Sequence, residues 1–295
     1  MKGLIVLNPY GLPNNSSYQA ERLTEEFNKL GVPCEICKDG YSRARVNENG
    51  FITALSGFKF VIYLDKDKYL SDIIARSGIK MFNSHNSIRV CDDKGETYIA
   101  LCDKGLNVPE TVFAPLCYDD AFPYPKGFLE YVEKTLGYPI IVKESYGSMG
   151  KGVRLAADGK ELRAISDKVK KVPHLYQKYL GKKKGFDIRV TVVGQKAVCA
   201  MARVNDNDFR SNIALGGKGY AIDIFSDEYA GYKAAAEKCA EVLGLDYCGV
   251  DLLVGDDGRP FVCEVNSNAF FKETEKVTGV NVAKIYAEYV LKVLK

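Results

Sequence analysis

Over the first 92 residues, short apolar runs alternate with longer amphipathic stretches. Each short run predicts a buried strand, and each amphipathic stretch predicts a helix that ends near a glycine. Strands are predicted at 4–7, 32–37, 58–64 and 79–82, and helices at 18–30 and 69–76. This alternation predicts an open α/β layer of parallel strands. The turn after the first strand lacks the G-x-G-x-x-G spacing, so it gives little support for a dinucleotide site.

The rest of the chain mixes amphipathic helices with strands that pair as antiparallel hairpins. Helices are predicted at 94–104, 128–136, 227–243 and 285–294. The helix at 227–243 carries one apolar stripe, made of Ala235, Cys239, Val242 and Leu243. Strands are predicted at 139–143, 152–155, 174–179, 187–193, 197–203, 247–254 and 261–266. We therefore expect an α+β region after the parallel layer.

Composition and charge exclude several classes of protein. The 295 residues are enough for two or three packed units, and the net charge of +3 gives no argument for nucleic acid or a membrane surface as a partner. No apolar run approaches the length that spans a bilayer, and the N-terminal run is too short for a signal peptide. Nine dispersed cysteines suit reduced thiols, so we expect a cytoplasmic protein.

One Cys-x-x-Cys pair, Cys34 and Cys37, stands alone in the chain. A zinc site would need a second such pair or nearby histidines, and only His85 and His174 occur. We therefore expect no zinc site, and we interpret both cysteines as residues of a short strand rather than as a redox pair.

The strongest chemical signal is a hairpin near the C-terminus. Two β-branched runs flank a turn rich in Gly and Asp, at 247–254 and 261–266. Symmetric closure would place Val254 opposite Phe261. It would also place Asp251 opposite Glu264, with Asn266 on the same face as Glu264. Opposed carboxylates repel, and a divalent cation such as Mg²⁺ would remove that cost. The alternative is a solvated face with two exposed carboxylates.

A glycine-rich loop joins the strands predicted at 139–143 and 152–155. Its sequence, Glu-Ser-Tyr-Gly-Ser-Met-Gly-Lys-Gly, fails the Walker pattern because Val153 stands where lysine is required. A hairpin loop that closes over phosphates fits better, since glycines let backbone N–H groups approach phosphate oxygens. The alternative is a flexible hairpin turn.

Two lysines flank this region with ambiguous roles. Lys143 ends the strand before the loop, where it could reach a phosphate or could be an ordinary strand-end lysine. Lys94 begins a predicted helix, where the helix dipole disfavours a cation unless an anionic ligand binds there.

Further charged residues follow. The lysine run at 182–184 is either a solvated loop or an electropositive rim for an acidic substrate. Asp187 and Arg189 lie two residues apart on one strand face, so they could share a cleft. Arg210 and Asn212 follow a polar loop, and arginine suits bidentate binding of phosphate or carboxylate.

Taken together, these segments resemble the ATP-grasp superfamily, and most closely its RimK-like carboxylate–amine (alpha-L-glutamate) ligases. The resemblance covers about residues 80–295, where the segments occur in family order and spacing, and the N-terminal layer agrees with the family's usual leading domain. The segments that carry it are 93–94, 105–111, 141–153, 177–179, 185–189, 208–212, 249–251 and 264–266.

The resemblance implies roles for individual residues. ATP phosphates would be bound by Lys94, Lys143, Gly147, Ser148, Gly150 and Gly152. Adenine would be contacted by the hinge residues Gln177, Lys178 and Tyr179, mainly through backbone groups, and Asp187 would lie near the nucleotide. The transferring phosphate would be held by Arg189, Arg210 and Asn212, with Ser211 in the nucleotide site. Mg²⁺, or Mn²⁺ in its place, would be bound by Asp251, Glu264 and Asn266.

The implied reaction has two steps. A substrate carboxylate attacks the γ-phosphate of ATP to form an acyl-phosphate, and an amine then displaces phosphate to give an amide or peptide bond. The expected amino acid is glutamate-like, added to a small molecule, a peptide or a protein terminus. The alternatives are a small-molecule kinase on the same scaffold and a non-catalytic nucleotide-binding partner protein.

Two departures from the family pattern bear on selectivity. Residues 267–271 lack the Pro and Gly found there in many relatives, and Lys178 stands where Glu is frequent. We therefore look for acceptor selectivity at Phe270, Phe271 and the 205–215 loop.

The resemblance also implies a domain division and an oligomeric state. An N-terminal domain would cover 1–92 and an ATP-grasp domain 93–295, with a central lid subdomain at about 110–184 and a metal-binding subdomain at about 185–295. Relatives often form homo-oligomers, so we expect one here.

Overall fold

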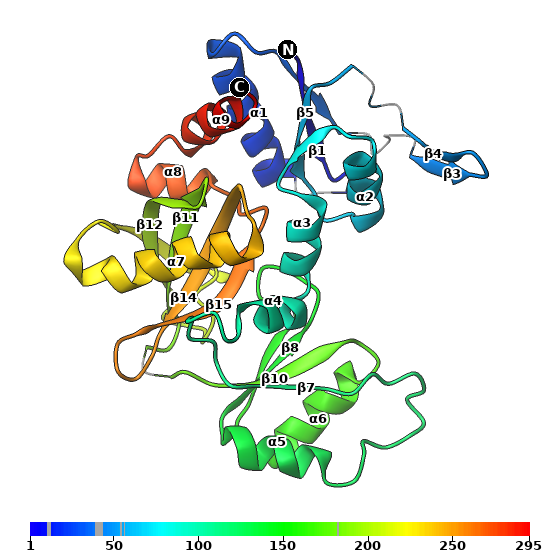
Figure 1. The fold of residues 1–295 in the computed structure, drawn as a ribbon. Helices are drawn as coiled ribbons and strands as arrows, with labels where there is room; N and C mark the ends of the chain where they lie inside the picture. The colour runs from blue at the N-terminus through cyan, green and yellow to red at the C-terminus, as the bar shows by residue number, and fades with distance from the viewer. Residues whose placement is uncertain (11–12, 39–43, 54, 56, 182) are drawn as a thin grey trace.

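The computed structural model describes residues 1–10, 13–38, 44–53, 55, 57–181 and 183–295. Its N-terminal sheet is parallel, as predicted, with the strand order β2-β1-β5-β6. These strands are β1 (Gly3–Leu7), β2 (Cys34–Cys37), β5 (Phe60–Leu64) and β6 (Lys80–Phe82). A small hairpin of β3 (Arg45–Asn47) and β4 (Gly50–Ile52), which the sequence analysis did not predict, stands apart from this sheet (Figure 1).

Both faces of the N-terminal sheet are buried, which explains its continuous apolar runs. Ile5, Leu7 and Ile62 pack with residues of α1 (Pro13–Lys29) on one face. Leu4 and Val61 pack with residues of α2 (Lys68–Arg76) on the other. Period-two alternation therefore assigns successive side chains to two different helices.

Two helices connect the N-terminal sheet to the rest of the molecule: α3 (His85–Asp92) and α4 (Lys94–Leu101) (Figure 1). Asp93 caps α4, because its Oδ1 accepts hydrogen bonds from the backbone N–H groups of Gly95 at 2.7 Å and Glu96 at 3.2 Å. Helix α4 was predicted from Lys94 onward. Helix α3 was missed, because it buries only Ser87, Ile88 and Cys91 and shows little apolar periodicity.

The central sheet is antiparallel with the order β7-β10-β8-β9. Its strands are β7 (Thr111–Phe113), β8 (Ile140–Glu144), β9 (Val153–Ala156) and β10 (His174–Lys178). Helices α5 (Phe128–Leu136) and α6 (Gly159–Val169) cover one face, where they pack on Ile140, Val142 and Tyr176. Helix α5 has the predicted bounds, whereas α6 was not predicted although Asp158 caps it.

The C-terminal sheet is antiparallel with the order β13-β12-β11-β14-β15. Its strands are β11 (Phe186–Val193), β12 (Lys196–Val204), β13 (Lys218–Ile222), β14 (Tyr247–Val254) and β15 (Pro260–Asn266). Helix α7 (Ala230–Leu243) packs on Ile188, Val190 and Val250. Of the predicted apolar stripe, Cys239 and Leu243 are buried and Ala235 and Val242 are partly buried; the rest of the buried face is Tyr232, Ala236 and Ala240. The predicted start of α7 at residue 227 is a short 3-10 helix (Asp227–Tyr229), and β13 was not predicted.

The β14–β15 hairpin corrects one part of the predicted register. Asp251 lies opposite Glu264, as expected, but Val254 lies opposite Pro260 and not opposite Phe261. A register shift between Asp251 and Leu252 separates the two halves, so one extra residue of β15 is accommodated there. The predicted pairing therefore holds on the side of the bulge away from the turn, from Gly249 to Asp251, and is shifted by one residue between the bulge and the turn.

The last two helices attach the N-terminal unit to the C-terminal sheet. Helix α8 (Lys272–Thr278) was not predicted, and α9 (Val282–Val293) was predicted three residues shorter at its start. Phe27 of α1 and Tyr286 and Val290 of α9 belong to the same buried cluster as the N-terminal strands. The two termini therefore meet through a shared apolar core.

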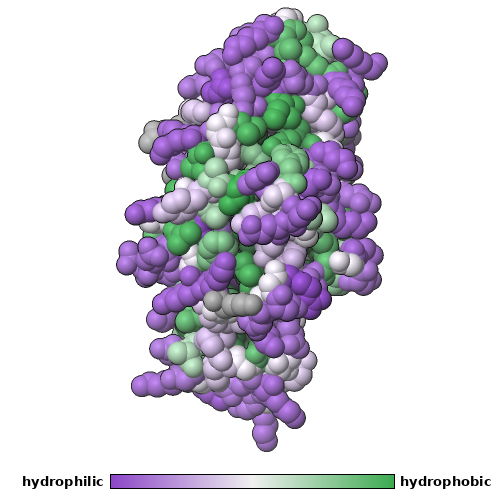
Figure 2. Space-filling view, turned by 90° about the vertical axis from the view of Figure 1, so that its left-hand side faces the viewer, coloured by the Kyte–Doolittle hydropathy of each residue, from purple (hydrophilic) through white to green (hydrophobic). Residues whose placement is uncertain are grey.

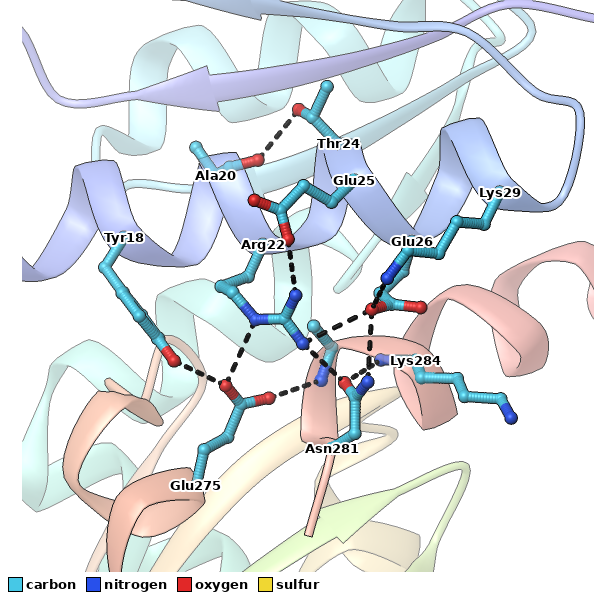
Figure 3. Close-up of polar contacts among 11 residues, drawn as sticks. Tyr18, Ala20, Arg22, Thr24, Glu25, Glu26, Lys29, Glu275, Asn281 and Lys284 are labelled. Carbon is cyan, nitrogen blue, oxygen red and sulfur yellow. Dashed lines mark hydrogen bonds and ion pairs between the residues drawn. The ribbon is translucent and has the colours of Figure 1, made fainter. Parts of the chain in front are cut away.

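A polar cluster reinforces this contact (Figure 3). Glu275 Oε2 accepts a hydrogen bond from the Tyr18 hydroxyl at 2.7 Å and from Arg22 Nε at 3.4 Å. Arg22 Nη2 donates to Asn281 Oδ1 at 2.9 Å, and Asn281 Nδ2 donates to Glu26 Oε1 at 3.1 Å. The cluster thus links α1 to both C-terminal helices.

The outer face that includes α7 and α8 is mostly hydrophilic, with hydrophobic side chains in smaller patches along its middle (Figure 2). Within the described part of the chain, no helix combines the length and the apolar character that crossing a membrane requires.

Replacing Glu275 with Ala should lower the free energy of unfolding by about 2 kcal/mol, because Arg22 and the Tyr18 hydroxyl lose a shared acceptor in a nearly buried site. Thermal unfolding would measure the change. Glu288→Ala is the matched control on α9, since its contact with Lys284 is an exposed 3.9 Å pair. Equal effects of the two substitutions would contradict this account.

The stability should also depend on pH through Glu26. Its pKa lies below the ordinary value of 4.5, mainly because Lys29 donates a hydrogen bond to it. The folded state therefore binds this proton more weakly than the unfolded state, so the stabilisation is present above pH 4.5 and is lost as pH falls through the lowered pKa. Thermal melts of Glu26→Gln against pH should show a flatter acid decline than wild type; an equally steep decline would contradict this account.

Candidate functional site

A cleft with about 930 Å³ of empty space lies between the central and C-terminal sheets; we call it the inter-sheet cleft. Strand alternation turns Ile141 and Lys143 of β8 toward it, away from the face that α5 and α6 cover. It is lined by 15 of the predicted site residues: Lys94, Lys143, Gly147, Ser148, Gly150, Gly152, Gln177, Lys178, Tyr179, Asp187, Arg210, Ser211, Asn212, Asp251 and Glu264. Arg189 and Asn266 do not line it.

The glycine-rich loop is held over this cleft from two sides. Lys94 Nζ donates to the carbonyl oxygen of Gly147 at 3.0 Å, and Arg210 Nη1 donates to that of Gly150 at 2.7 Å. Gly147 and Gly150 have φ angles of 127° and 73°, which favour glycine. The carboxylate of Asp208 orients Arg210 through hydrogen bonds to Nε at 3.0 Å and Nη2 at 2.7 Å.

Lys143 is a buried cation and not an ordinary strand-end lysine. Its Nζ lies 3.2 Å from the Tyr98 hydroxyl oxygen and 3.8 Å from Cys263 Sγ. Its side chain is buried yet lines the cleft, so its charge is directed at the cleft interior. Sequence reasoning missed Tyr98 and Cys263, because Tyr98 of α4 and Cys263 of β15 meet Lys143 only through the packing of these elements on the central sheet.

The hinge residues and the predicted lysine run make different contacts within the protein. The backbone N–H of Lys178 donates to Glu110 O at 2.9 Å, so it is already used within the protein. Lys183 Nζ lies 4.6 Å from the ring centre of Phe186 at the cleft. Lys182, the first residue of the predicted run, lies outside the described residues.

A chain of alternating charges starts at the inter-sheet cleft, which Asp187, Arg203 and Asp251 line, and ends at Arg189 outside it. Arg203 Nε donates to Asp187 Oδ1 at 2.7 Å, and Arg203 Nη2 contacts both Asp187 and Asp251, the latter at 2.8 Å. Arg189 binds Asp251 through Nε at 2.6 Å and Nη2 at 2.7 Å. Asp187, Arg203 and Asp251 are each at most 4% exposed. Asp187 and Arg189 therefore belong to one network through two intermediates. The expectation that they share a cleft is wrong, because Asp187 lines the inter-sheet cleft and Arg189 does not.

Arg203 was absent from the sequence prediction for a structural reason. Symmetric closure of the β11–β12 hairpin would place Asp187 opposite Ala202. A register shift between Thr191 and Val192 places it opposite Arg203 instead. A bulge of this kind leaves no clear signal in the sequence.

The network also changes the charge argument made for Asp251. Burial by itself would raise the pKa of Asp251, but Arg189 and Arg203 outweigh it and hold the pKa below its ordinary value of 3.8. The expected repulsion from Glu264 is therefore offset by two guanidinium groups, and Glu264 Oε1 itself lies 3.6 Å from Lys94 Nζ. The alternative of two exposed carboxylates is wrong for Asp251, which is 2% exposed.

The donor set nevertheless fits a hard cation. Asp251 lies opposite Glu264 in the hairpin and Asn266 lies two residues beyond Glu264, so the three offer two carboxylates and an amide oxygen. Nowhere in the described ranges do three His, Cys, Asp or Glu side chains converge, so a cation here would need the amide as well. The Cys34 thiol, whose pKa burial raises to about 12, suits a structural strand residue.

A second cavity of about 1660 Å³ lies between the N-terminal sheet and the C-terminal sheet; we call it the domain cavity. Arg189 and Asn266 line it from the C-terminal side, and Asn8 and Asp65 from the N-terminal side. Phe270 also lines it, but Phe271 is buried in the core beside Tyr18 and Tyr247, so the expectation that Phe271 contacts an acceptor is wrong. The residues common to both cavities are Ser148, Arg203, Asn212 and Glu264.

Replacing Arg203 with Met should lower the free energy of unfolding by about 3–5 kcal/mol, because two buried carboxylates would lose their common cation. Chemical denaturation would measure it. Arg259→Met is the matched control, since Arg259 pairs with Asp257 at an exposed turn. A loss for Arg203→Met no larger than for the control would contradict the proposed weight of this network.

Sequence comparisons place the chain among characterised relatives. The family model described as the RimK-like ATP-grasp domain matches residues 91–290. N-acetylaspartylglutamate synthase A of Homo sapiens is 33% identical over 234 residues, covering 78% of this chain and 57% of that protein. Beta-citrylglutamate synthase B of Homo sapiens is 32% identical over 234 residues, with coverage of 78% and 57%. The chain thus spans less than two thirds of the length of these relatives.

Solved structures share the fold. A RimK domain ATP-grasp protein from Sphaerobacter thermophilus aligns with a TM-score of 0.71 at 19% identity, covering 99% of this chain and 100% of that one. D-alanine–D-alanine ligase from Bacillus anthracis, complexed with ATP, aligns with a TM-score of 0.73 at 17% identity, with coverage of 100% and 98%. The ATP-grasp fold expected from the sequence is confirmed, and the chain belongs to the RimK-like ATP-grasp family.

Proposed function

We propose that this chain is an ATP- and Mg²⁺-dependent carboxylate–amine ligase that forms an amide bond through an acyl-phosphate. The observation that carries the proposal is the wall shared by the two cavities. Ser148, Arg203, Asn212 and Glu264 line both of them. A nucleotide in the inter-sheet cleft would therefore meet a substrate in the domain cavity at residues that carry charges and hydrogen-bond donors.

The inter-sheet cleft suits a nucleoside triphosphate. The buried ammonium of Lys143 and that of Lys94 supply positive charge, and the loop at 147–152 supplies backbone N–H groups for the phosphates. The hinge at 177–179 would contact adenine through groups other than the Lys178 N–H, with Asp187 on the nucleotide side. We propose that the ATP-grasp domain begins at residue 93, with the lid at about 110–184 and the metal-binding part at about 185–295.

Asp251, Glu264 and Asn266 would hold Mg²⁺, or Mn²⁺ in its place. Bound there, the cation would neutralise phosphate charge as it develops. To bind it, Glu264 would release Lys94 and Asp251 would give up part of its contact with the arginines. Lys94 and the two arginines would then remain beside the phosphates, where their charge is still useful.

The remaining work is positioning. A substrate carboxylate oxygen attacks the γ-phosphorus, the bond to the bridging oxygen breaks, and ADP leaves. The amine then attacks the acyl carbon and phosphate leaves with the former carboxylate oxygen. Arg189, Arg210 and Asn212, with Ser211 beside them, would hold the transferring phosphate through donated hydrogen bonds. Asp251 holds Arg189 and Asp208 holds Arg210 before substrate arrives, which saves reorganisation.

The substrate class follows from the relatives. Two of them are named for glutamate-containing products, N-acetylaspartylglutamate and beta-citrylglutamate. We infer that this chain adds a glutamate-like amino acid to a small molecule, a peptide or a protein terminus, and that it works in the cytoplasm without nucleic acid. A homo-oligomer stays a prediction.

Phosphate release from Mg-ATP against a panel of carboxylic acids and amines, with mass spectrometry of each mixture, tests the function. A ligase releases phosphate and forms an adduct that has lost water. A product heavier by a phosphoryl group would instead show a kinase, and no turnover with any mixture would favour a binding role.

Glu264→Gln should lower kcat by about a hundredfold or more, because a carboxylate that would bind Mg²⁺ becomes neutral. Thermal unfolding should show that the fold persists. Glu241→Gln, on the exposed surface of α7, is the control and should retain activity. Undiminished turnover of Glu264→Gln would refute the metal assignment.

A further inference from the structure

The domain cavity contains a buried carboxylate for which the proposed reaction so far has no use. Asp65 directly follows β5, lines the cavity and is 7% exposed. We propose that Asp65, oriented by Asn8, binds the ammonium group of the amino-acid substrate that supplies the amine. This inference rests on the proposed function and assigns the N-terminal unit a direct part in it.

The hydrogen bonds of Asp65 leave one oxygen for a ligand. Its Oδ1 accepts from Asn8 Nδ2 at 2.9 Å and from the backbone N–H of Lys66 at 2.6 Å. Its Oδ2 accepts no hydrogen bond from any residue that the structure describes. The carboxylate is therefore fixed in orientation and still has an acceptor available.

Charge points to a cation as the ligand. Among the described residues Asp65 has no ion-pair partner, whereas the other acidic groups of the cavity have one: Glu264 with Lys94 at 3.6 Å and Glu273 with Lys276 at 3.4 Å. The adjacent Lys66 turns to Asp92, at 2.8 Å. A nearly buried carboxylate without a counter-charge is costly, and a substrate ammonium would remove that cost.

The position of Asp65 in the fold supports binding. The order β2-β1-β5-β6 reverses direction between β1 and β5, and ligands of open α/β sheets bind outside the carboxyl ends of the strands at such a switch point. Leu7 and Leu64 are paired neighbours at those ends, so the following residues, Asn8 and Asp65, meet there. β1 and β5 lie side by side in the N-terminal unit (Figure 1).

The opposite wall completes the geometry. Arg189, Asn266 and Asn212 line the same cavity from the C-terminal side, where the acyl-phosphate would form. An amine held at Asp65 would therefore approach the acyl carbon from the N-terminal side. The substrate ammonium must lose a proton before its nitrogen can attack. The carboxylate of Asp65, hydrogen-bonded to that ammonium, would accept the proton.

The test uses Asp65→Asn, which keeps the shape and an oxygen for Asn8. Asp67→Asn is the matched control two residues away, where asparagine caps α2 as well as aspartate does. Hydroxylamine, a small neutral nucleophile, traps the acyl-phosphate without an ammonium site. Asp65→Asn should form hydroxamate within about twofold of wild type, yet raise KM for the amine about 10–100-fold, as loss of a charge-assisted hydrogen bond requires. The control should change neither quantity.

Direct binding separates this inference from the proposed function. Calorimetry with Mg-ADP present would compare L-glutamate with glutarate, L-aspartate with succinate and L-alanine with propionate. Wild type should prefer the amino member of at least one pair, and Asp65→Asn should lose that preference. Absence of any preference in wild type overturns the inference. If Asp65→Asn forms hydroxamate and its KM for the amine is unchanged, the role of Asp65 is refuted but the proposed ligase function is not. If no acid tested gives hydroxamate with wild type, the proposed ligase function itself is refuted.

Discussion

The guanidinium of Arg203 binds two buried carboxylates, Asp187 and Asp251, at the point where both cavities meet. Removing charges from water costs several kcal/mol for each ion, and only close pairing with hydrogen bonds repays that cost. The chain from Asp187 through Arg203 and Asp251 to Arg189 meets this condition across three strands. It keeps charged groups inside the protein, beside the place where a phosphate would be transferred.

This network constrains its surroundings. β11 pairs with β12 and with β14, so the register of both pairs must bring the four charges together. On the opposite face the same strands pack on α7 through apolar residues such as Val190 and Val250. The sheet therefore separates an apolar face from a charged face, and a register slip of one residue would exchange them.

The N-terminal unit is joined to this sheet by packing and by charge. Phe27 of α1 and Tyr286 of α9 share one apolar cluster, and Glu275 binds Tyr18 and Arg22 beside it. Because that contact is extensive, the carboxyl ends of β1 and β5 are held against the wall that carries Arg189. The N-terminal unit, which the resemblance implied only as a leading domain, thus lines one side of the domain cavity.

Local pattern determined most elements and the family. Apolar runs located the parallel strands, and glycines located the loop between β8 and β9. Turn residues between two apolar runs located the hairpin that pairs Asp251 with Glu264. Hydrophobic period and turn chemistry are local properties, so the sequence carries them directly. Local pattern missed α3, whose buried face is Ser87, Ile88 and Cys91, and α6, whose cap at Asp158 was present but not used.

Only the tertiary structure decided which charges meet. Two bulges set the partners of Asp187 and Val254, and packing of distant segments brought Tyr98 to Lys143 and Asp65 to the domain cavity. Such contacts depend on register and on long-range packing, which no short stretch of sequence encodes.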